Sequence, residues 1–237
     1  MTGFRESLQR KKASGFIPVI PDIKLISPKE GHLFRDRGPV STAVRMEELG
    51  APAISVVTEP KEFGGSMKLL LDIVSAVSVP VLRKDFITDE DDLKRTKDCG
   101  ASAVLLICAC LTKEKLRELY EASLLLSLEP LVEAHTKEAL LLADSLGAKL
   151  VGINNRDILS LERDGGGVSL TRELASFVPE GALLVSESGI ETPGQAKAAI
   201  LAGAGAVLVG TALWKSENFD EFYEELCRGE SKQSDTT

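Results

Sequence analysis

The strongest constraint on the fold of this 237-residue chain is a pattern that repeats along most of its length. A short apolar run is followed by a loop and then by a segment with apolar residues at helical spacing. Several runs are almost continuous in Val, Ile and Leu, which is typical of parallel strands buried on both faces. The eight predicted strands span residues 16–23, 53–58, 79–83, 103–107, 130–133, 150–154, 183–186 and 206–210.

The segments between these runs predict helices. Gly-Ala pairs begin at Gly50, Gly100, Gly147 and Gly203, each between a predicted helix and the next strand. Glycine adopts the left-handed conformation that ends a helix and turns the chain back. The predicted helices span residues 39–49, 66–77, 89–99, 112–126, 136–146, 169–177, 192–202 and 219–228.

Alternating strand and helix units in one chain of this length predict a single (β/α)8 TIM barrel with parallel strands. An open doubly wound sheet would require a glycine-rich turn after its first strand, where this chain has Asp22-Ile23-Lys24. We therefore expect a short N-terminal segment at 1–15 with a helix near 4–8, a catalytic barrel domain at 16–228, and a polar, disordered tail at 229–237.

Composition excludes several classes of protein. The net charge is −8 and the basic residues form no block, so we expect no nucleic-acid partner. No apolar stretch has the length of a membrane span and the N-terminus lacks a signal core, which predicts a cytoplasmic protein without membrane contact. The four cysteines show no paired spacing, and we interpret Cys108 and Cys110 as reduced, small apolar filler. No cluster of His, Cys and carboxylate residues predicts a metal site.

Polar residues gather where the predicted strands end. In a barrel of this type the active site lies at the carboxyl ends of the strands. Any one of these groups could form a salt bridge at the rim, but the whole set predicts a catalytic site, because a lysine among apolar walls and carboxylates can act as an acid and a buried glutamate as a base. The candidate catalytic residues are Lys84, Glu133, Lys24, Asp22, Asn154 and Glu187.

Small residues after the last two strands predict a phosphate site. Ser188-Gly189 and Gly210-Thr211 leave backbone N–H groups accessible where barrels of this type often bind phosphate. Ser27 could add a hydroxyl, or could belong to a plain loop. Phe63 and Phe86 are the candidate pocket walls, although a core position for Phe63 is an equal alternative.

The two histidines give no functional signal. We expect His135 to point away from Glu133 and interpret both His32 and His135 as surface or helix-cap residues.

Several of these stretches together resemble the indole-3-glycerol-phosphate synthase family of tryptophan biosynthesis, from about residue 16 to residue 214. The stretches are Asp22-Ile23-Lys24, Ser27-Pro28, Ser55-Val56-Val57-Thr58-Glu59, Phe63, Gly65-Ser66, Val81-Leu82-Arg83-Lys84-Asp85-Phe86, Glu129-Pro130-Leu131-Val132-Glu133, Gly152-Ile153-Asn154-Asn155-Arg156-Asp157, Ser186-Glu187-Ser188-Gly189-Ile190 and Val209-Gly210-Thr211.

The resemblance implies a (β/α)8 barrel that closes an indole ring on 1-(2-carboxyphenylamino)-1-deoxyribulose 5-phosphate, with loss of CO2 and water and without metal or organic cofactor. It implies Lys84 as general acid and Glu133 as general base or its electrostatic partner. Lys24 and Arg156 would bind the carboxylate. Asn154 and Glu187 would orient the ribulose hydroxyls, and Ser188, Gly189, Gly210 and Thr211 would hold the phosphate.

The chain also departs from the family pattern. Asp22 stands where the family has glutamate, the family's Ser-Pro-Ser is Ser27-Pro28-Lys29, Gly64 replaces a larger polar residue, and the segment before the first strand is short. Two alternatives therefore stay open: a divergent paralogue acting on a related amino-ribulose phosphate, and a catalytically inactive barrel that binds a phosphate ligand. The oligomeric state is open as well.

Overall fold

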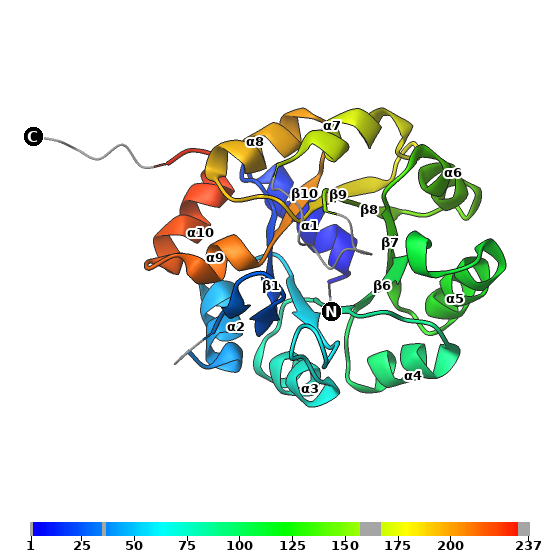
Figure 1. The fold of residues 1–237 in the computed structure, drawn as a ribbon, viewed down its shortest axis with the longest axis horizontal. Coiled ribbons are helices and arrows are strands. Elements are labelled where there is room, and N and C mark those ends of the chain that lie inside the picture. The colour runs from blue at the N-terminus through cyan, green and yellow to red at the C-terminus, as the bar shows by residue number, and fades with distance from the viewer. Residues whose placement is uncertain (1, 35–36, 157–166, 232–237) are drawn as a thin grey trace, which may run out of the picture.

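The computed structural model describes residues 2–34, 37–156 and 167–231. Its centre is a closed barrel of parallel strands in the order β1-β10-β9-β8-β7-β6-β5-β4, surrounded by helices (Figure 1). This confirms the predicted TIM barrel. The barrel strands are β1 (Val19–Ile23), β4 (Ile54–Val57), β5 (Val81–Lys84), β6 (Ala103–Ile107), β7 (Glu129–Ala134), β8 (Leu150–Asn154), β9 (Leu183–Glu187) and β10 (Ala206–Val209).

The outer helices follow the sequence prediction to within a few residues at each end, which is where helix boundaries are least defined. Three of these helices begin at an N-cap threonine, at positions 112, 136 and 192. Each threonine side chain accepts a hydrogen bond from a backbone N–H of the first turn. These helices are α2 (Pro39–Glu48), α3 (Met67–Ala76), α4 (Glu90–Asp98), α5 (Lys113–Leu125), α6 (Lys137–Ser145), α7 (Ser169–Leu174), α8 (Pro193–Leu201) and α10 (Phe219–Arg228).

The structure adds short elements that periodicity did not reveal. Strands β2 (Ile26–Ser27) and β3 (Gly31–His32) form an antiparallel hairpin after β1, and helix α9 (Thr211–Lys215) follows β10. A 3-10 turn, η1 (Cys108–Cys110), follows β6, and η3 (Ala175–Phe177) completes the helix predicted at 169–177. Elements of two to five residues are too short to show a hydrophobic period.

The core has two layers, one between barrel and helices and one inside the barrel. Helix α1 (Phe4–Ala13) lies across the middle of the ring of strands in Figure 1 and packs Phe4 and Leu8 into the inner layer. Glu129, the first residue of β7, accepts the backbone N–H of Phe4, so α1 covers the amino ends of the strands. The carboxyl ends remain for a site.

Two parts of the sequence prediction lie outside the described residues: Asp157, and residues 232–237 of the predicted tail. The predicted domain limits stay predictions. In the part of the chain that the structure describes, no helix is both long and apolar enough to span a membrane.

Candidate active site

The catalytic candidates project inward because of strand alternation. In a strand, residues two apart share a face, so a side chain two positions after an inner-core residue also points into the barrel. The inner layer contains Ile20, Leu82, Leu131 and Val185. The residues two positions later are Asp22, Lys84, Glu133 and Glu187.

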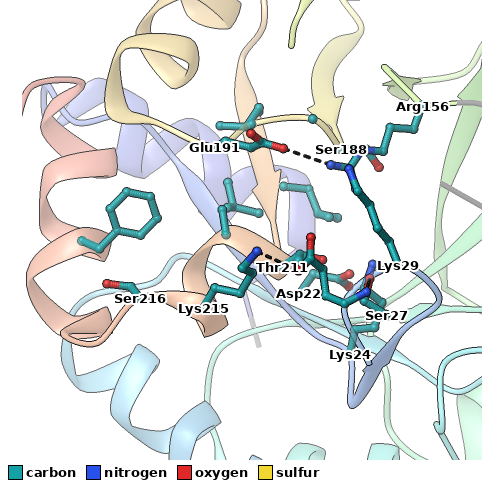
Figure 2. Close-up of a pocket in the computed structure, with 18 of the residues that line it drawn as sticks. Asp22, Lys24, Ser27, Lys29, Arg156, Ser188, Glu191, Thr211, Lys215 and Ser216 are labelled. Carbon is teal, nitrogen blue, oxygen red and sulfur yellow. Dashed lines mark hydrogen bonds and ion pairs between the residues drawn. The ribbon is translucent and has the colours of Figure 1, made fainter. Parts of the chain in front are cut away.

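A cavity of about 480 Å³ opens at this end of the barrel (Figure 2). Three of the predicted catalytic residues, Glu133, Asn154 and Glu187, do not line it and are completely buried. The predicted residues that line it are Asp22, Lys24, Ser27, Lys84, Arg156, Ser188, Gly189, Gly210 and Thr211. The structure therefore brings most of the predicted site around one cavity, with a buried polar layer beside it.

Asp22 is fixed by three neighbours. Its Oδ1 accepts a hydrogen bond from Ser55 Oγ at 2.7 Å, and its carbonyl oxygen accepts one from Trp214 Nε1 at 2.7 Å. A Cβ atom on Gly210 would lie 3.2 Å from Asp22 Oδ2, so glycine at this position leaves room for the carboxylate. The short aspartate thus has a defined position in the cavity wall.

Lys84 is anchored through the residues on either side of it. The Arg83 and Asp85 side chains alternate to the outer face of β5, where they form an ion pair at 2.9 Å. Arg83 also pairs with Asp92 of α4 at 3.0 Å and bonds Thr58 at the end of β4. This largely buried network ties β5 to its neighbours on the outside, so the Lys84 side chain enters the cavity from a fixed backbone.

The two asparagines at the end of β8 face in opposite directions. Asn155 faces outward, donates to Ser186 Oγ and to the Glu187 carbonyl oxygen, and accepts from Thr171. It therefore joins β8, β9 and α7. Asn154 faces inward, and its Oδ1 accepts the backbone N–H of Arg156 at 3.1 Å. Asn154, the amide chosen as a candidate catalytic residue, is therefore the one that faces the barrel interior.

Glu133 and His135 lie on the same side of the chain, which corrects the expectation that His135 points away. His135 Nε2 is 3.7 Å from Glu133 Oε1. The residues are two positions apart, so strand alternation places them together and the expectation misread the spacing. His135 is half-buried, with a side-chain exposure of 17%, and is not a surface residue.

Cys108 and Cys110, on the turn after β6, are half-buried near Glu133. Burial first, and the charge of Glu133 second, raise the pKa of the Cys108 thiol to about 12. The same two causes raise the pKa of Cys110. Both thiols are free and protonated at neutral pH, which agrees with their interpretation as reduced, small apolar filler.

The predicted phosphate site includes a turn with unusual backbone angles. Ser188 and Gly189 both have positive φ, 60° and 70°, and a Cβ atom on Gly189 would lie 2.5 Å from the carbonyl oxygen of Gly167. Only glycine fits this position without moving the chain. The turn therefore presents small residues and backbone to the cavity.

Sequence reasoning missed several charged residues of the cavity. Lys29 and Glu30 come from the β2–β3 hairpin, Lys215 from α9 and Glu191 from the loop after β9. Lys215 pairs with Glu30 at 2.7 Å, and this hydrogen bond lowers the pKa of Glu30.

Arg156 pairs with Glu191 at 3.2 Å. Figure 2 shows the Lys29 side chain extending from the hairpin toward Ser188 and Arg156. Among the described residues, Lys29 forms no ion pair or hydrogen bond. Its place in the sequence directly after Ser27-Pro28, a candidate phosphate-binding stretch, was the signal that could have identified Lys29.

The two phenylalanines do not line the cavity. Phe63 is buried, and the Lys24 ammonium lies 5.4 Å from the centre of its ring. Phe86 is half-buried and packs against the inner core. Phe63 is thus placed to support Lys24 through a cation–π contact rather than to form a wall of this cavity.

Across residues 2–34, 37–156 and 167–231, no group of three or more His, Cys, Asp or Glu side chains is arranged to hold a metal ion. The cavity groups are lysines, an arginine, hydroxyls, backbone N–H groups and isolated carboxylates. Such a set is suited to binding a polyanion and transferring protons.

Comparison with known proteins agrees with this geometry. The family model described as indole-3-glycerol phosphate synthase matches residues 1–226. An indole-3-glycerol phosphate synthase of Pyrococcus furiosus is 42% identical over 96% of this chain and 98% of its own length. Those of Thermococcus kodakarensis and Oceanobacillus iheyensis are 43% and 39% identical, over 90% and 89% of this chain and 92% and 80% of their own lengths. The chain belongs to the indole-3-glycerol phosphate synthase family, whose members are carboxy-lyases of tryptophan biosynthesis.

Proposed function

We propose that the cavity binds 1-(2-carboxyphenylamino)-1-deoxyribulose 5-phosphate and that its residues close the indole ring. The new carbon–carbon bond joins the ring carbon that carries the carboxylate to the ketone carbon of the ribulose chain. CO2 leaves from the first and water from the second. Each step needs a proton donor or acceptor held at the reacting atoms.

The phosphate would bind at the corner formed by Ser188, Gly189, Gly210 and Thr211. These residues offer hydroxyl and backbone N–H donors from the ends of β9 and β10. Lys29 would add a cation from the hairpin side, because its side chain extends toward Ser188 and forms no ion pair with the described residues. Ser27 lines the same cavity and adds a hydroxyl.

The substrate carboxylate would be held by Lys24 and Arg156. Both side chains are buried in the cavity wall, where water screens charge poorly and an anion is attracted strongly. Arg156 already holds Glu191 at 3.2 Å, so the substrate carboxylate would compete with or replace that partner. These cations would hold the carboxylate in place before it leaves as CO2.

Lys84 would act as general acid and Glu133 as general base. Lys84 lines the cavity and would protonate the ketone oxygen or the departing hydroxyl. Glu133 lies in the polar layer beside the cavity, where it would accept a proton or stabilise positive charge. Asn154 and Glu187 in the same layer would orient the ribulose hydroxyls, and Asp22 would assist from the opposite wall.

The observation that carries this proposal is the position of Lys84 in one cavity with the phosphate corner and the Lys24–Arg156 pair. Lys84→Met keeps most of the side chain's volume and removes its proton. We expect turnover to fall by at least about 100-fold, measured by the fluorescence of the indole product. Lys149→Met is the matched control, because Lys149 is an exposed lysine just before β8, at the end of the barrel away from the cavity.

Turnover by Lys84→Met at the wild-type rate would contradict the acid role. Absence of any turnover by the unmodified protein would leave the ligand-binding alternative. Asp22→Glu, assayed beside the wild type, tests the divergent-paralogue alternative. A large gain in that variant would show that the aspartate marks an altered specificity.

A further inference from the structure

Glu133 is a buried carboxylate that accepts no hydrogen bond from the described part of the chain. Its side chain is completely buried, and neither oxygen has a hydrogen-bond partner among the described residues. Burying a charged group in this way is costly unless another group compensates it. A group near Glu133 is therefore expected to compensate the buried carboxylate.

The two residues paired with Glu133 in the sheet offer it no donor side chain. In the sheet, Glu133 lies between Ile107 on β6 and Gly152 on β8. One of these side chains is a hydrocarbon and the other is absent. The nearby Cys108 and Cys110 are protonated thiols, which are weak donors, and neither forms a hydrogen bond to Glu133.

His135 is a polar group that the structure places beside the carboxylate. Its Nε2 atom is 3.7 Å from Glu133 Oε1, and both ring nitrogens are buried without a hydrogen-bond partner in the described part of the chain. The distance is too long for a hydrogen bond. Contacts of catalytic groups are often loose without substrate and shorten when it binds.

The backbone on both sides of His135 is fixed. Ala134 ends β7, and the side chain of Thr136 begins α6 by accepting the backbone N–H of Ala139 at 3.2 Å. The imidazole can therefore approach Glu133 by side-chain rotation alone. This is the arrangement in which a third group orients a catalytic base.

We propose that His135 is a positioning residue for Glu133: Nε2–H donates to Oε1 in the substrate complex and turns Oε2 toward the reacting atoms. The inference rests on the proposed role of Glu133 as general base. Beyond that role, the orientation of the Glu133 carboxylate would depend on Nε2 of His135.

Three substitutions separate this role from simple space filling. The side-chain nitrogen of glutamine is as many bonds from the backbone as Nε2 of histidine, whereas that of asparagine corresponds to Nδ1. Leucine fills space and donates nothing. His135→Leu should lower kcat by about 10- to 100-fold with KM unchanged, because the base is misplaced while substrate binding is not. His135→Gln should recover most of the loss, and His135→Asn should not.

The experiment is steady-state kinetics on the three variants and on Glu133→Gln, with urea unfolding of each to establish that it is folded. Wild-type kcat in His135→Leu, or equal kcat in the glutamine and asparagine variants, would overturn the inference. If those results appear while Glu133→Gln has lost turnover, only the role of His135 fails. If Glu133→Gln turns over at the wild-type rate, the proposed base itself is wrong and the inference falls with it.

Discussion

A Cβ atom on Gly152 would lie 1.9 Å from Oε1 of Glu187. The Glu187 carboxylate on β9 therefore occupies the space above a glycine on the neighbouring strand β8. Gly152 also pairs with Glu133 on its other side. One missing side chain thus makes room in the buried polar layer, and the glycine is required there by close approach rather than by its backbone angles.

Gly152→Ala should displace the Glu187 side chain and lower turnover by about 100-fold, because a shift of about 1 Å in a positioned group has an effect of that size. The assay is kcat and KM by product fluorescence. Gly194→Ala is the matched control, since its Cβ would meet nothing closer than Thr192 Oγ1 at 3.9 Å. Equal turnover in the two variants would mean that the position of Glu187 is not critical.

Lys29→Met should raise KM about fivefold at low salt while leaving kcat unchanged. An exposed cation near the substrate phosphate contributes about 1 kcal/mol in water, and salt screens this attraction. The difference in KM between variant and wild type should therefore shrink as NaCl is added. Lys149→Met should show wild-type KM at every salt concentration. A salt-independent difference would place Lys29 outside the reach of the phosphate.

Cys108 should make the protein less stable at alkaline pH. Its pKa rises from 9.0 to about 12 on folding, so between these values the unfolded thiol releases a proton that the folded thiol retains. The free energy of unfolding therefore falls as pH increases in this range, by up to about 1.4 kcal/mol per pH unit for one group. Cys108→Ala should show a shallower fall.

Urea unfolding from pH 8.5 to 10.5 measures this slope. The same comparison at pH 7, where the thiol is protonated in both states, isolates the effect of packing. Parallel stability curves for the two proteins across the alkaline range would contradict the raised pKa.

Phe4→Ala should lower the free energy of unfolding by about 3–5 kcal/mol, because it opens a cavity in the inner core under the barrel. KM should not change in the folded variant, since α1 covers the end of the barrel opposite the cavity. Urea unfolding and steady-state kinetics test both parts. A raised KM with unchanged stability would show that α1 acts on the site and not on the core.

Much of the fold was predictable because the physical signals are local. Continuous apolar runs such as that at β6 predict buried strands, and the glycines at 50, 100, 147 and 203 have the positive φ expected after a helix. The β2–β3 hairpin and α9 were missed because two to five residues carry no hydrophobic period. Alternation along the chain puts Glu133 and His135 on the same side, contrary to the expectation for His135.

The sequence by itself determined the barrel, because strand and helix periods and turn residues depend on near neighbours along the chain. It also determined which end holds the polar groups. Only the tertiary structure decided what those groups meet: Glu187 over Gly152, and Lys29 extending toward Ser188. These relations join separate strands or depend on side-chain direction in three dimensions, and no local pattern encodes the distances between them.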